Sequence, residues 1–512
     1  MSQFRGSLHK RSLEYKNEEN FKDIEQNQLN KIIKFESISA KRDVANVDED
    51  SALSKLSYKF FKSTKSSKET DITDLQRKLI KTDSDLNKTY ETIFKDIIDN
   101  VKKFSYSEKE SQLSVLSKLE ELNVLKENTS VVYEQEGHFL PEELNGLGYM
   151  NLFAMIFNIH IIMDLFKTKN LESKRPADIN LLFIEEPEAH THPQMQYVFI
   201  KNIKNLLQEE GKDLNNLQTI ISTHSAHITS QCDFNDIKYF LRENSNIIVK
   251  NISELQKKYE DRDSDKSIFQ FLKQYLTLNR AELFFSEKLI LIEGDTERIL
   301  IPAMMKKIDL ENKDVKEYTP LLSQNISVTE VGAYSHIFDQ FIDFLQIKTM
   351  IITDIDSVEP AVNGKACPVS KGTHTSNASI RYFTNDKSLN ELIKLDFKDK
   401  IFLLKDNKWE SHKDGNLCIT YQTEENEYHA RSFEDAFISL NLEYIKSNKD
   451  SFKSLKNREV LEATSPDYYE IAKNCIGKKS IFATDILYYS NSEFSDWDIP
   501  KYIKDSLLWL AE

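Results

Sequence analysis

The chain has 512 residues, of which 39% are hydrophobic and 11% aromatic, and its 83 acidic and 68 basic residues give a formal net charge of −15. This composition excludes a wholly disordered chain, and the length allows two or three domains that each bury a core. Only 11 Gly and 10 Pro exclude collagen-like and Pro-rich architectures. The acidic balance argues against a surface that binds nucleic acid throughout, but it is compatible with a local basic groove.

The cysteines and the most apolar segment indicate where in the cell the protein is located. Cys232, Cys367, Cys418 and Cys475 lie far apart and form no C-x-x-C pair, so they offer no evident zinc site or disulfide framework. A reduced, cytoplasmic location fits best. The apolar stretch 152–166 is interrupted by polar residues and is shorter than the roughly 20 residues of a membrane span, so we expect a buried helix and no membrane partner. The first residues lack the apolar segment of a signal peptide.

The first part of the chain predicts one strand followed by helices. Residues 31–45 begin with alternating apolar and polar side chains, which predicts a strand that leads into a loop. Between about 51 and 128 the chain is rich in charge, and its apolar residues recur at helical spacing. The predicted amphipathic helix carries Leu75, Leu79, Leu86, Tyr90, Ile93, Ile97 and Val101. A second helix is expected within 108–126, and the pair forms either a packed hairpin or a dimerisation arm.

Strands and helices alternate from residue 129 onward, which indicates α/β domains with parallel sheets covered on both faces. The predicted strands lie at 180–184, 218–222, 289–292, 327–331 and 349–353. Helices are expected at 151–167 and 194–207. The polar stretch 257–266 predicts a linker, so that two α/β domains join near 255–285.

Carboxylates, a histidine and two glycines follow one another in the first of these domains. Glu185 and Glu186 come directly after a buried strand, where one carboxylate can hold a hydrated Mg²⁺ and its neighbour can polarise a water. His224 follows the next strand, and Gly146 and Gly148 open a helix whose free N–H groups suit an anion. Taken singly, each feature is also explained by a solvated turn or by a glycine needed for packing.

In this order and spacing, these residues resemble an ABC-type ATPase with its signature loop, Walker B strand and switch histidine. The resemblance implies that Glu185 binds Mg²⁺, that Glu186 is the general base and that His224 senses the γ-phosphate. Gly146 and Gly148 would belong to the signature loop, which completes the nucleotide site of the partner subunit in ABC dimers.

The chain contains no Walker A motif, G-x-x-x-x-G-K-[ST]. That loop supplies the backbone N–H groups and the lysine that hold the phosphates of ATP. We therefore expect an ATPase domain without its first strands and phosphate-binding loop, and a poor affinity of this chain for ATP. A separate polypeptide that supplies the loop is the alternative.

Four carboxylates of the second domain follow two buried strands. Glu293 ends the first of these strands, and Glu297 lies one helical turn further on. Asp354 and Asp356 end the other strand and, at positions i and i+2 of an extended chain, are expected to point the same way. Such carboxylates repel one another unless cations lie between them, and hard oxygen ligands favour Mg²⁺ or Mn²⁺. A helix cap and a turn explain the two pairs when each is taken alone.

Together these carboxylates resemble the TOPRIM domain of topoisomerases, primases and nucleases. An ABC-type ATPase followed by TOPRIM is the arrangement of the overcoming lysogenization defect (OLD) family of nucleases, whose relatives include the nuclease subunit of the Gabija anti-phage system. The resemblance covers the chain from about residue 31. In that family a second acidic motif and a lysine complete a two-metal site. Glu434 and Lys479 match those positions here, and Lys478 competes for the lysine role.

The resemblance implies phosphodiester hydrolysis with two metal ions. Five carboxylates would bind them, Glu293, Asp354 and Asp356 at one ion and Glu297 and Glu434 at the other. Lys479 would stabilise the charge that develops on the phosphate. Two further features stay open: Gly332 allows either a close backbone approach or a plain turn, and the loop 357–377 either contacts DNA or is solvated.

The predicted fold is therefore α/β, with an incomplete ABC-type ATPase domain that carries a helical insertion, followed by a Rossmann-like TOPRIM domain. The expected limits are 1–50 for a remnant of the ATPase N-terminal part, 51–128 for the helical insertion and possible dimerisation arm, 129–254 for the ATPase core, 255–285 for a linker helix and 286–512 for the TOPRIM nuclease domain.

The family likeness implies a Mg²⁺- or Mn²⁺-dependent DNA endonuclease or nickase of bacterial anti-phage defence. It also implies a dimer-based homo-oligomer whose ATPase domain regulates cutting, and it allows a helicase-like partner. The alternative is a non-catalytic ATPase-fold subunit that binds DNA and assembles a defence complex. A topoisomerase or primase is disfavoured, because neither a nucleophilic tyrosine domain nor a primase zinc motif is evident.

Overall fold

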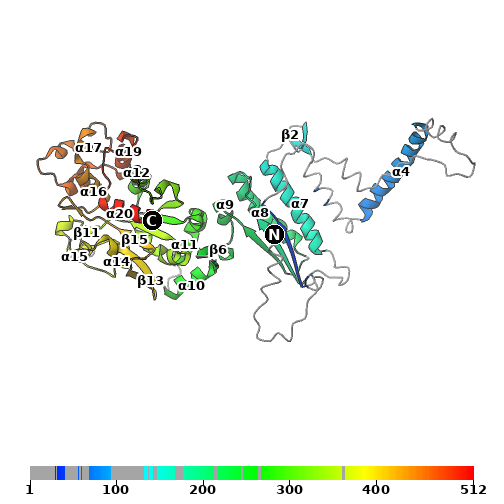
Figure 1. Ribbon diagram of the computed structural model, residues 1–512, viewed down its shortest axis with the longest axis horizontal. Coiled ribbons are helices and arrows are strands. Elements are labelled where there is room, and N and C mark those ends of the chain that lie inside the picture. Colours follow the sequence, from blue (N-terminus) through cyan, green and yellow to red (C-terminus); the bar gives the residue numbers. More distant parts are fainter. Residues whose placement is uncertain are drawn as a thin grey trace, which may run out of the picture. The chain divides into compact units, whose positions relative to one another are not determined.

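The computed structural model divides the chain into two units, Met1–Gln231 and Cys232–Glu512 (Figure 1). It describes residues 32–40, 69–93, 132–135, 138–141, 147–167, 177–212, 216–243, 246–262, 267–359 and 364–512, together with residues 29, 56, 59 and 214. The boundary between the units precedes the limit at residue 254 that the sequence predicts for the ATPase core.

The first unit contains a three-stranded parallel sheet whose strands confirm three of the predicted ones. Its order is β1 (Ile33–Ile38), β4 (Ile179–Glu185) and β5 (Leu217–Ser222). Successive side chains of β4 alternate between the two faces, so that Leu182 and Ile184 are buried on one face.

Two helices cover that face of the sheet, α7 (Leu147–Lys167) and α8 (Pro193–Glu210). On the other face, Phe35 of β1 is 47% exposed and Ile220 of β5 is 45% exposed, while the rings of Phe35 and Phe183 lie 5.0 Å apart. Among the described residues, helices therefore cover only one face, whereas the apolar strands predict a sheet covered on both.

Helix α7 includes a segment, Met150–Lys167, that is long and apolar enough to cross a membrane by length and composition alone. However, Met155, Ile159 and Met163 of this helix are fully buried in the same core as Leu182 of the sheet. The expected buried helix is thus a core helix of the first unit.

The charged region before α7 contributes a long helix and a hairpin. Helix α4 (Glu69–Ile93) confirms the first predicted amphipathic helix as far as Ile93. Ile97 and Val101 of that predicted helix, and the expected helix within 108–126, lie outside the described residues. A short antiparallel hairpin, β2 (Val132–Gln135) and β3 (His138–Pro141), was not predicted.

The second unit is built on a six-stranded mixed sheet in the order β14-β13-β15-β10-β8-β9. Its strands are β8 (Lys288–Ile292), β9 (Ile326–Glu330), β10 (Lys348–Ile352), β13 (Ile401–Lys405), β14 (Lys408–Ser411) and β15 (Leu417–Thr420). Strands β9, β8, β10 and β15 are parallel, and β13 and β14 extend the sheet antiparallel. Three of these strands are those predicted at 289–292, 327–331 and 349–353.

Alternate residues of the central strands belong to two separate cores, one on each face of the sheet. Ile290 and Ile292 of β8 pack into the first core, and Leu289 and Leu291 of the same strand pack into the second. Such burial on both faces explains why these strands are apolar throughout.

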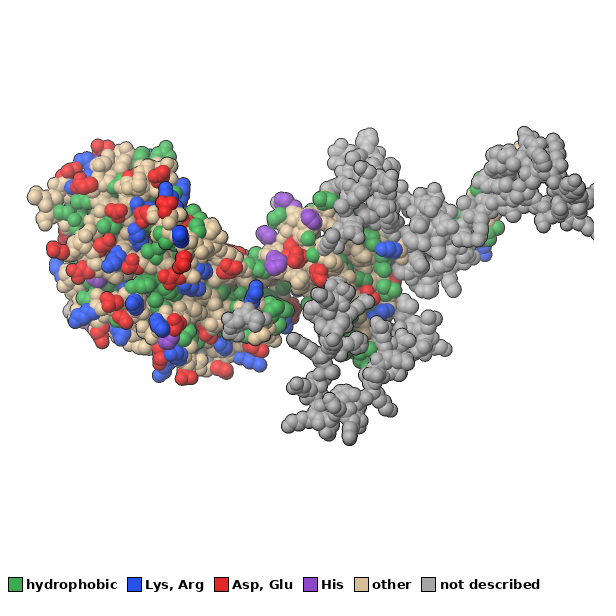
Figure 2. Space-filling model, in the orientation of Figure 1, with side chains coloured by type: hydrophobic (Ala, Val, Ile, Leu, Met, Phe, Trp, Pro, Cys, Tyr) green, Lys and Arg blue, Asp and Glu red, His purple; other side chains and the backbone are tan. Residues whose placement is uncertain are grey.

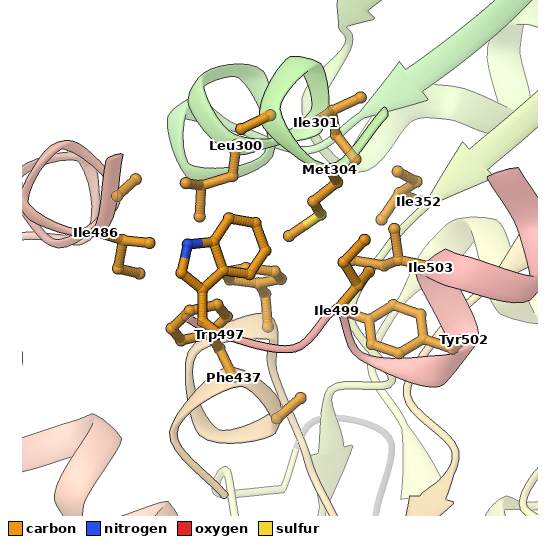
Figure 3. Packing of buried hydrophobic residues seen from close by; sticks show 14 of the residues in the cluster. Leu300, Ile301, Met304, Ile352, Phe437, Ile486, Trp497, Ile499, Tyr502 and Ile503 are labelled. Carbon is orange, nitrogen blue, oxygen red and sulfur yellow. The ribbon is translucent and has the colours of Figure 1, made fainter. Parts of the chain in front are cut away.

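The first core lies beneath four helices, α12 (Asp295–Glu311), α16 (Phe433–Leu440), α19 (Lys479–Tyr489) and α20 (Lys501–Ala511). Figure 3 shows the indole of Trp497 between Leu300 and Phe437, and the two aromatic rings lie 5.7 Å apart. These helices carry Glu297, Glu434 and Lys479 on their first turns, so this core fixes the positions of three predicted site residues.

The second core includes segments that were predicted to lie between the domains. The hairpin of β6 (Lys238–Glu243) and β7 (Asn246–Asn251) is followed by α10 (Ser253–Arg262) and α11 (Ser267–Leu278). Leu255 and Tyr259 of α10 and Leu272 of α11 are buried in the same core as Leu289 and Leu291 of β8. The prediction of a linker was wrong for residues 257–262, because these polar residues lie on α10, a helix whose apolar side chains are buried, while residues 263–266 lie outside the described residues.

The C-terminal end of helix α20 is held by side chains at the amino ends of β8, β9 and β10. Lys348 Nζ donates to the carbonyl oxygen of Trp509 at 2.6 Å, and Lys288 Nζ donates to those of Leu510 and Ala511. Gln324 Nε2 also donates to the carbonyl of Ala511, at 3.1 Å. Cationic side chains are favourable at a helix C-terminus, where unpaired carbonyl groups carry partial negative charge.

Candidate active site

The carboxyl ends of β8 and β10, which are adjacent parallel strands, position the predicted acidic residues. Glu293 follows β8 directly, and α12 starts two residues later, so that Glu297 lies in its first turn and is only 7% exposed. Asp354 follows β10 by two residues. Burial raises the pKa of both Glu297 and Asp354, and the neighbouring charges of Glu434 and Glu293 raise it further, which indicates that these side chains share one site.

Two neutral side chains hold Glu293. Its Oε1 accepts hydrogen bonds from the hydroxyl of Thr353 and, at 2.8 Å, from Nδ2 of Asn377. Asn377 is itself 4% exposed and is the N-cap of α14 (Ala378–Phe383), where its Oδ1 accepts from two backbone N–H groups. Within the loop 357–377, Asn377 therefore faces inward, and its side chain is not available for the DNA contact considered from the sequence.

Asp354 is held from two other elements. Its Oδ1 accepts from Nε2 of Gln422 at 2.7 Å and from the backbone N–H of Phe433 at 2.9 Å. Gln422 follows β15, and Phe433 begins α16. These bonds bring the end of β15 and the start of α16 to the carboxylate of Asp354.

The expectation that Asp354 and Asp356 point the same way along an extended chain was wrong. Strand β10 ends at Ile352, and Asp356 has a φ of +44°, in the left-handed region. Its carboxylate forms an ion pair with Arg431 at 2.6 Å, whereas Asp354 is bound by Gln422 and Phe433. Asp356 thus reaches the site by a turn of the backbone and not by the alternation of a strand.

Glu434 and Lys479 meet as the family likeness implied. Glu434 is 3% exposed, and its Oε2 lies 2.7 Å from Nζ of Lys479, while its Oε1 accepts from Thr296 at 3.3 Å. Lys478 is the exposed N-cap residue of α19. Of the two lysines, Lys479 is the one paired with a site carboxylate.

Burial dominates the electrostatics of the site. It raises the pKa of Glu293, Asp354 and Asp356, and for Asp356 it does so against the opposing charge of Arg431. Burial alone would lower the pKa of Lys479, but the carboxylates of Glu434 and Asp354 raise it above its ordinary value. Lys479 therefore remains a cation, and the carboxylates are destabilised in their charged form.

The effect of this burial on stability can be measured at Glu297. Burial, with the charges of Glu434 and Glu293, raises its pKa to about 7 from the model-peptide value of 4.5. Because the folded protein binds this proton more tightly, the free energy of unfolding falls as pH rises from about 4.5 to about 7. We expect Glu297→Gln to remove this loss and to raise the free energy of unfolding by about 3 kcal/mol at pH 8.

The measurement is urea unfolding in EDTA at pH 5 and pH 8, which keeps metal ions out of the comparison. The difference between Glu297→Gln and the wild-type protein is expected to shrink toward zero at the lower pH. If the two proteins differed equally in the free energy of unfolding at both pH values, the pKa of Glu297 would not be raised by its surroundings.

The donor set matches the chemistry of a hard divalent cation, since several buried carboxylates share one region and raise one another's pKa. Within the described part of the chain, however, no three acidic, histidine or cysteine side chains are close enough to hold an ion as they stand. Lys479 and Arg431 lie against two of the carboxylates instead. Binding of a cation would thus require small side-chain movements.

Gly332 and Asp435 have local structural roles beside this site. Gly332 has a φ of +58°, and no atom lies within 4 Å of where a Cβ would be, so its backbone conformation and not a close approach calls for glycine. Asp435 accepts from the backbone and hydroxyl of Ser432, both at 2.6 Å, and from the N–H of Arg431 at 2.7 Å. Asp435 thereby caps α16, which carries Glu434.

In the first unit, the predicted ATPase residues lie at the carboxyl ends of β4 and β5. Glu185 Oε2 accepts from the hydroxyl of Ser39 at 3.2 Å and from the N–H of Ala40 at 3.3 Å. Glu186, with a φ of +40°, has its Oε1 3.6 Å from Nε2 of His224. The structure thus brings the side chains of Glu186 and His224 together.

The loop between Glu186 and α8 connects these residues to the start of α7. Glu188, which was not predicted, accepts from the hydroxyl of Thr223 at 2.9 Å and from the N–H of His224 at 2.6 Å. A Cβ at Gly148 would lie 3.0 Å from the carbonyl oxygen of His190, so glycine there allows α7 to approach the loop. Gly146 lies outside the described residues.

Sequence reasoning missed three residues that bind the predicted acidic ones, Thr353, Gln422 and Arg431. It also missed Glu188, which accepts from the backbone N–H of His224. Asn377 was noted only as a surface residue. Neutral polar side chains such as Gln422 carry no motif, and only the fold brings its position to Asp354. Of the missed residues, only Thr353 could have been found from the sequence, because it lies beside Asp354 at the end of a buried strand.

Two protein families match the chain. Residues 2–229 match an AAA ATPase domain, and residues 284–356 match the TOPRIM domain of overcoming lysogenization defect protein-like sequences. The second match includes Glu293, Glu297, Asp354 and Asp356, and ends before Glu434 and Lys479.

Two curated relatives are similar over large parts of the chain. Endonuclease GajA of Bacillus cereus (strain HuB5-5) is 32% identical over 428 residues, which are 76% of this chain and 56% of that protein. Old nuclease of Escherichia phage P2 is 30% identical over 240 residues, which are 46% of this chain and 37% of that protein. This chain therefore spans about half or less of the length of these relatives.

Among solved structures, the C-terminal region of the Burkholderia pseudomallei OLD protein is 20% identical, covers 44% of this chain and 98% of that chain, and has a TM-score of 0.28. The domain matches agree with the mixed α/β fold described above. The chain is thus a relative of the OLD nucleases, with an AAA ATPase region followed by an OLD-like TOPRIM domain.

Proposed function

We propose that the second unit is a DNA endonuclease or nickase that hydrolyses phosphodiester bonds with Mg²⁺ or Mn²⁺. The observation that carries the proposal is the group of half-buried carboxylates at the ends of β8 and β10, with the buried Glu297 and Glu434 and one lysine from α19. The names of the relatives, an endonuclease and a nuclease, support the same reaction class.

The roles of the residues follow from their charges. The cations would be held by the five carboxylates Glu293, Glu297, Asp354, Asp356 and Glu434. A pair of bound divalent cations in such a site supplies an activated water and neutralises the leaving 3′-oxygen. Because the pKa of Lys479 is raised, its ammonium group keeps its proton and can stabilise negative charge on the phosphate.

The surface charge limits how DNA would be bound. Figure 2 shows acidic and basic side chains interspersed over the visible face of the second unit. With a net charge of −15, attraction over the whole surface is disfavoured, so we expect contacts with DNA phosphates to be few and local.

The experiment that tests the proposal is conversion of supercoiled plasmid to nicked or linear DNA. We expect conversion by the purified chain with Mg²⁺ or Mn²⁺ and none in excess EDTA. Conversion that persists in EDTA would contradict the metal assignment. If neither cation supports conversion, the alternative of a non-catalytic subunit that assembles a complex on DNA is favoured.

ATP is expected to have no effect on this chain by itself. Glu185, Glu186 and His224 act on a nucleotide that a Walker A loop must hold, and the sequence contains no such motif. Calorimetric titration with ATP and Mg²⁺ is therefore expected to show no binding, and ATP should change neither the melting temperature nor DNA cleavage. Micromolar affinity for ATP would contradict this expectation.

The remaining parts of the proposal rest on likeness to the family. We propose a cytoplasmic, dimer-based homo-oligomer in which the ATPase region mediates dimerisation and regulates cutting. The proposal includes a role in defence against phage and allows a helicase-like partner. The domain limits expected from the sequence belong to the same proposal, with the ATPase region ending near residue 231.

A further inference from the structure

Two buried carboxamides stand directly behind the two acidic residues that follow β8 and β10. Asn377 donates to Glu293 at 2.8 Å, and Gln422 donates to Asp354 at 2.7 Å. The two amides come from different elements, the N-cap of α14 and the segment after β15, and they are 4% and 1% exposed. The same type of contact thus occurs at both strand ends.

The orientation of the Asn377 amide is determined by the backbone. Its Oδ1 accepts from the N–H groups of Ser379 and Ile380, both at 3.1 Å. A flipped amide would place its NH₂ group against these two donors, so the carbonyl oxygen must face the helix. The NH₂ group must therefore face outward, where its two hydrogens are shared between Glu293 and the hydroxyl of Thr353 at 2.7 Å.

The orientation of the Gln422 amide is also determined by a backbone donor. Its Oε1 accepts from the N–H of Ile355 at 2.8 Å, which fixes the carbonyl side of the amide. Its Nε2 then donates both to Asp354 and, at 3.2 Å, to the hydroxyl of Tyr502 on α20. Every donor of this amide is in use, so its side chain has one hydrogen-bonded arrangement.

These amides differ from Arg431 and Lys479, which also pair with acidic residues of the site, in carrying no charge. Arg431 and Lys479 bring positive charge to Asp356 and Glu434, and a cation at the site would compete with them. An amide donor fixes the direction of a carboxylate and leaves its negative charge available to a cation. Partners of this kind, which orient metal-binding carboxylates without binding the metal, influence affinity strongly.

We infer that Asn377 and Gln422 are positioning residues that orient Glu293 and Asp354 for a divalent cation. The inference rests on the proposed metal-dependent function and adds to it the two side chains that prepare the site. Neither residue contacts the cation or the DNA in this scheme.

The variants can be chosen to keep the fold. Asn377→Ser keeps an N-cap oxygen for α14, because serine is a favoured N-cap residue, but it has no amide to donate to Glu293. Gln422→Met keeps the length of the side chain and removes both donors. The matched control is Gln324→Met, since Gln324 donates only to the backbone carbonyls of Thr319 and Ala511 at the opposite end of the sheet.

The readout is Mn²⁺ affinity measured by calorimetry without DNA, at 25 °C, with the melting temperature of each protein in EDTA measured alongside. We expect Asn377→Ser and Gln422→Met each to weaken Mn²⁺ binding by about 10- to 100-fold, while Gln324→Met binds as the wild type does. Folded variants with weakened Mn²⁺ binding support the inference.

Other results overturn it. If both variants bind Mn²⁺ as tightly as the wild type and only melt at a lower temperature, the amides serve the fold alone. An equal weakening in Gln324→Met would show that the loss does not depend on the site. Failure of the wild-type protein to bind Mn²⁺ would overturn the proposed function as well, and it is recognised from the wild type before any variant is compared.

Discussion

Replacement of Asp354 by alanine is expected to reduce the rate of plasmid nicking by at least about 10³-fold. Asp354 joins three elements at the site, because it follows β10 and accepts from Gln422 and from the N–H of Phe433. Its loss removes one of the five carboxylates that we propose as metal ligands. Initial rates of nicking with Mg²⁺ measure the effect.

The matched control is Asp414→Ala. Asp414 is an exposed residue between β14 and β15, and it is not one of the proposed site residues. This variant is expected to nick at the wild-type rate, and both variants should unfold at urea concentrations close to that of the wild type. Nicking at the wild-type rate by Asp354→Ala would remove the basis for the proposed site.

Lys479→Ala is expected to reduce nicking by about 10²- to 10³-fold, which is the effect of losing one preorganised charge that faces the reacting phosphate. Lys479 is the only lysine within the described residues that pairs with Glu434, at 2.7 Å. The same change leaves the nearly buried carboxylate of Glu434 without its cation, which is destabilising. Nicking rates and urea unfolding should therefore both respond.

The neighbouring lysine supplies the control for this prediction. Lys478 has the same charge one residue earlier, and both lysines are exposed, but Lys478 precedes the first turn of α19 and it is Lys479 that pairs with Glu434. Lys478→Ala is expected to change nicking less than about threefold, as is usual for an exposed substitution. A larger loss in Lys478→Ala than in Lys479→Ala would transfer the catalytic role to Lys478.

The strands and the acidic residues of the site were predictable because both follow from burial. A strand covered on two faces, such as β8 with Leu289 and Ile290 in different cores, must be apolar throughout, and that pattern is visible in the sequence. Charged residues can follow such a strand only at its end. Glu293 and Asp354 were therefore identified together with the strands that position them.

The remaining features depend on contacts between residues far apart in the sequence. Asp356 adopts a left-handed conformation that an extended pattern cannot predict, and α10 appeared to be a linker because its exposed side is strongly polar. Gln422 lies 68 residues from Asp354, and a single glutamine carries no signal of its partner. Neutral groups that hold a site are recognised only when the fold brings them to it.

The attachment of α20 has a consequence for the synthesis of the protein. This helix is bound by Lys288 and Lys348 from the two central strands, and its Tyr502 contacts Gln422, which holds Asp354. On the ribosome, β8 emerges some 200 residues before α20 (288 against 501), so the second unit lacks part of its first core until translation reaches that helix. Nascent chains and products of premature termination would therefore contain every proposed catalytic residue without the packing that aligns them. If the second unit cleaves DNA as we propose, it would gain this activity only after α20 has been synthesised and has docked.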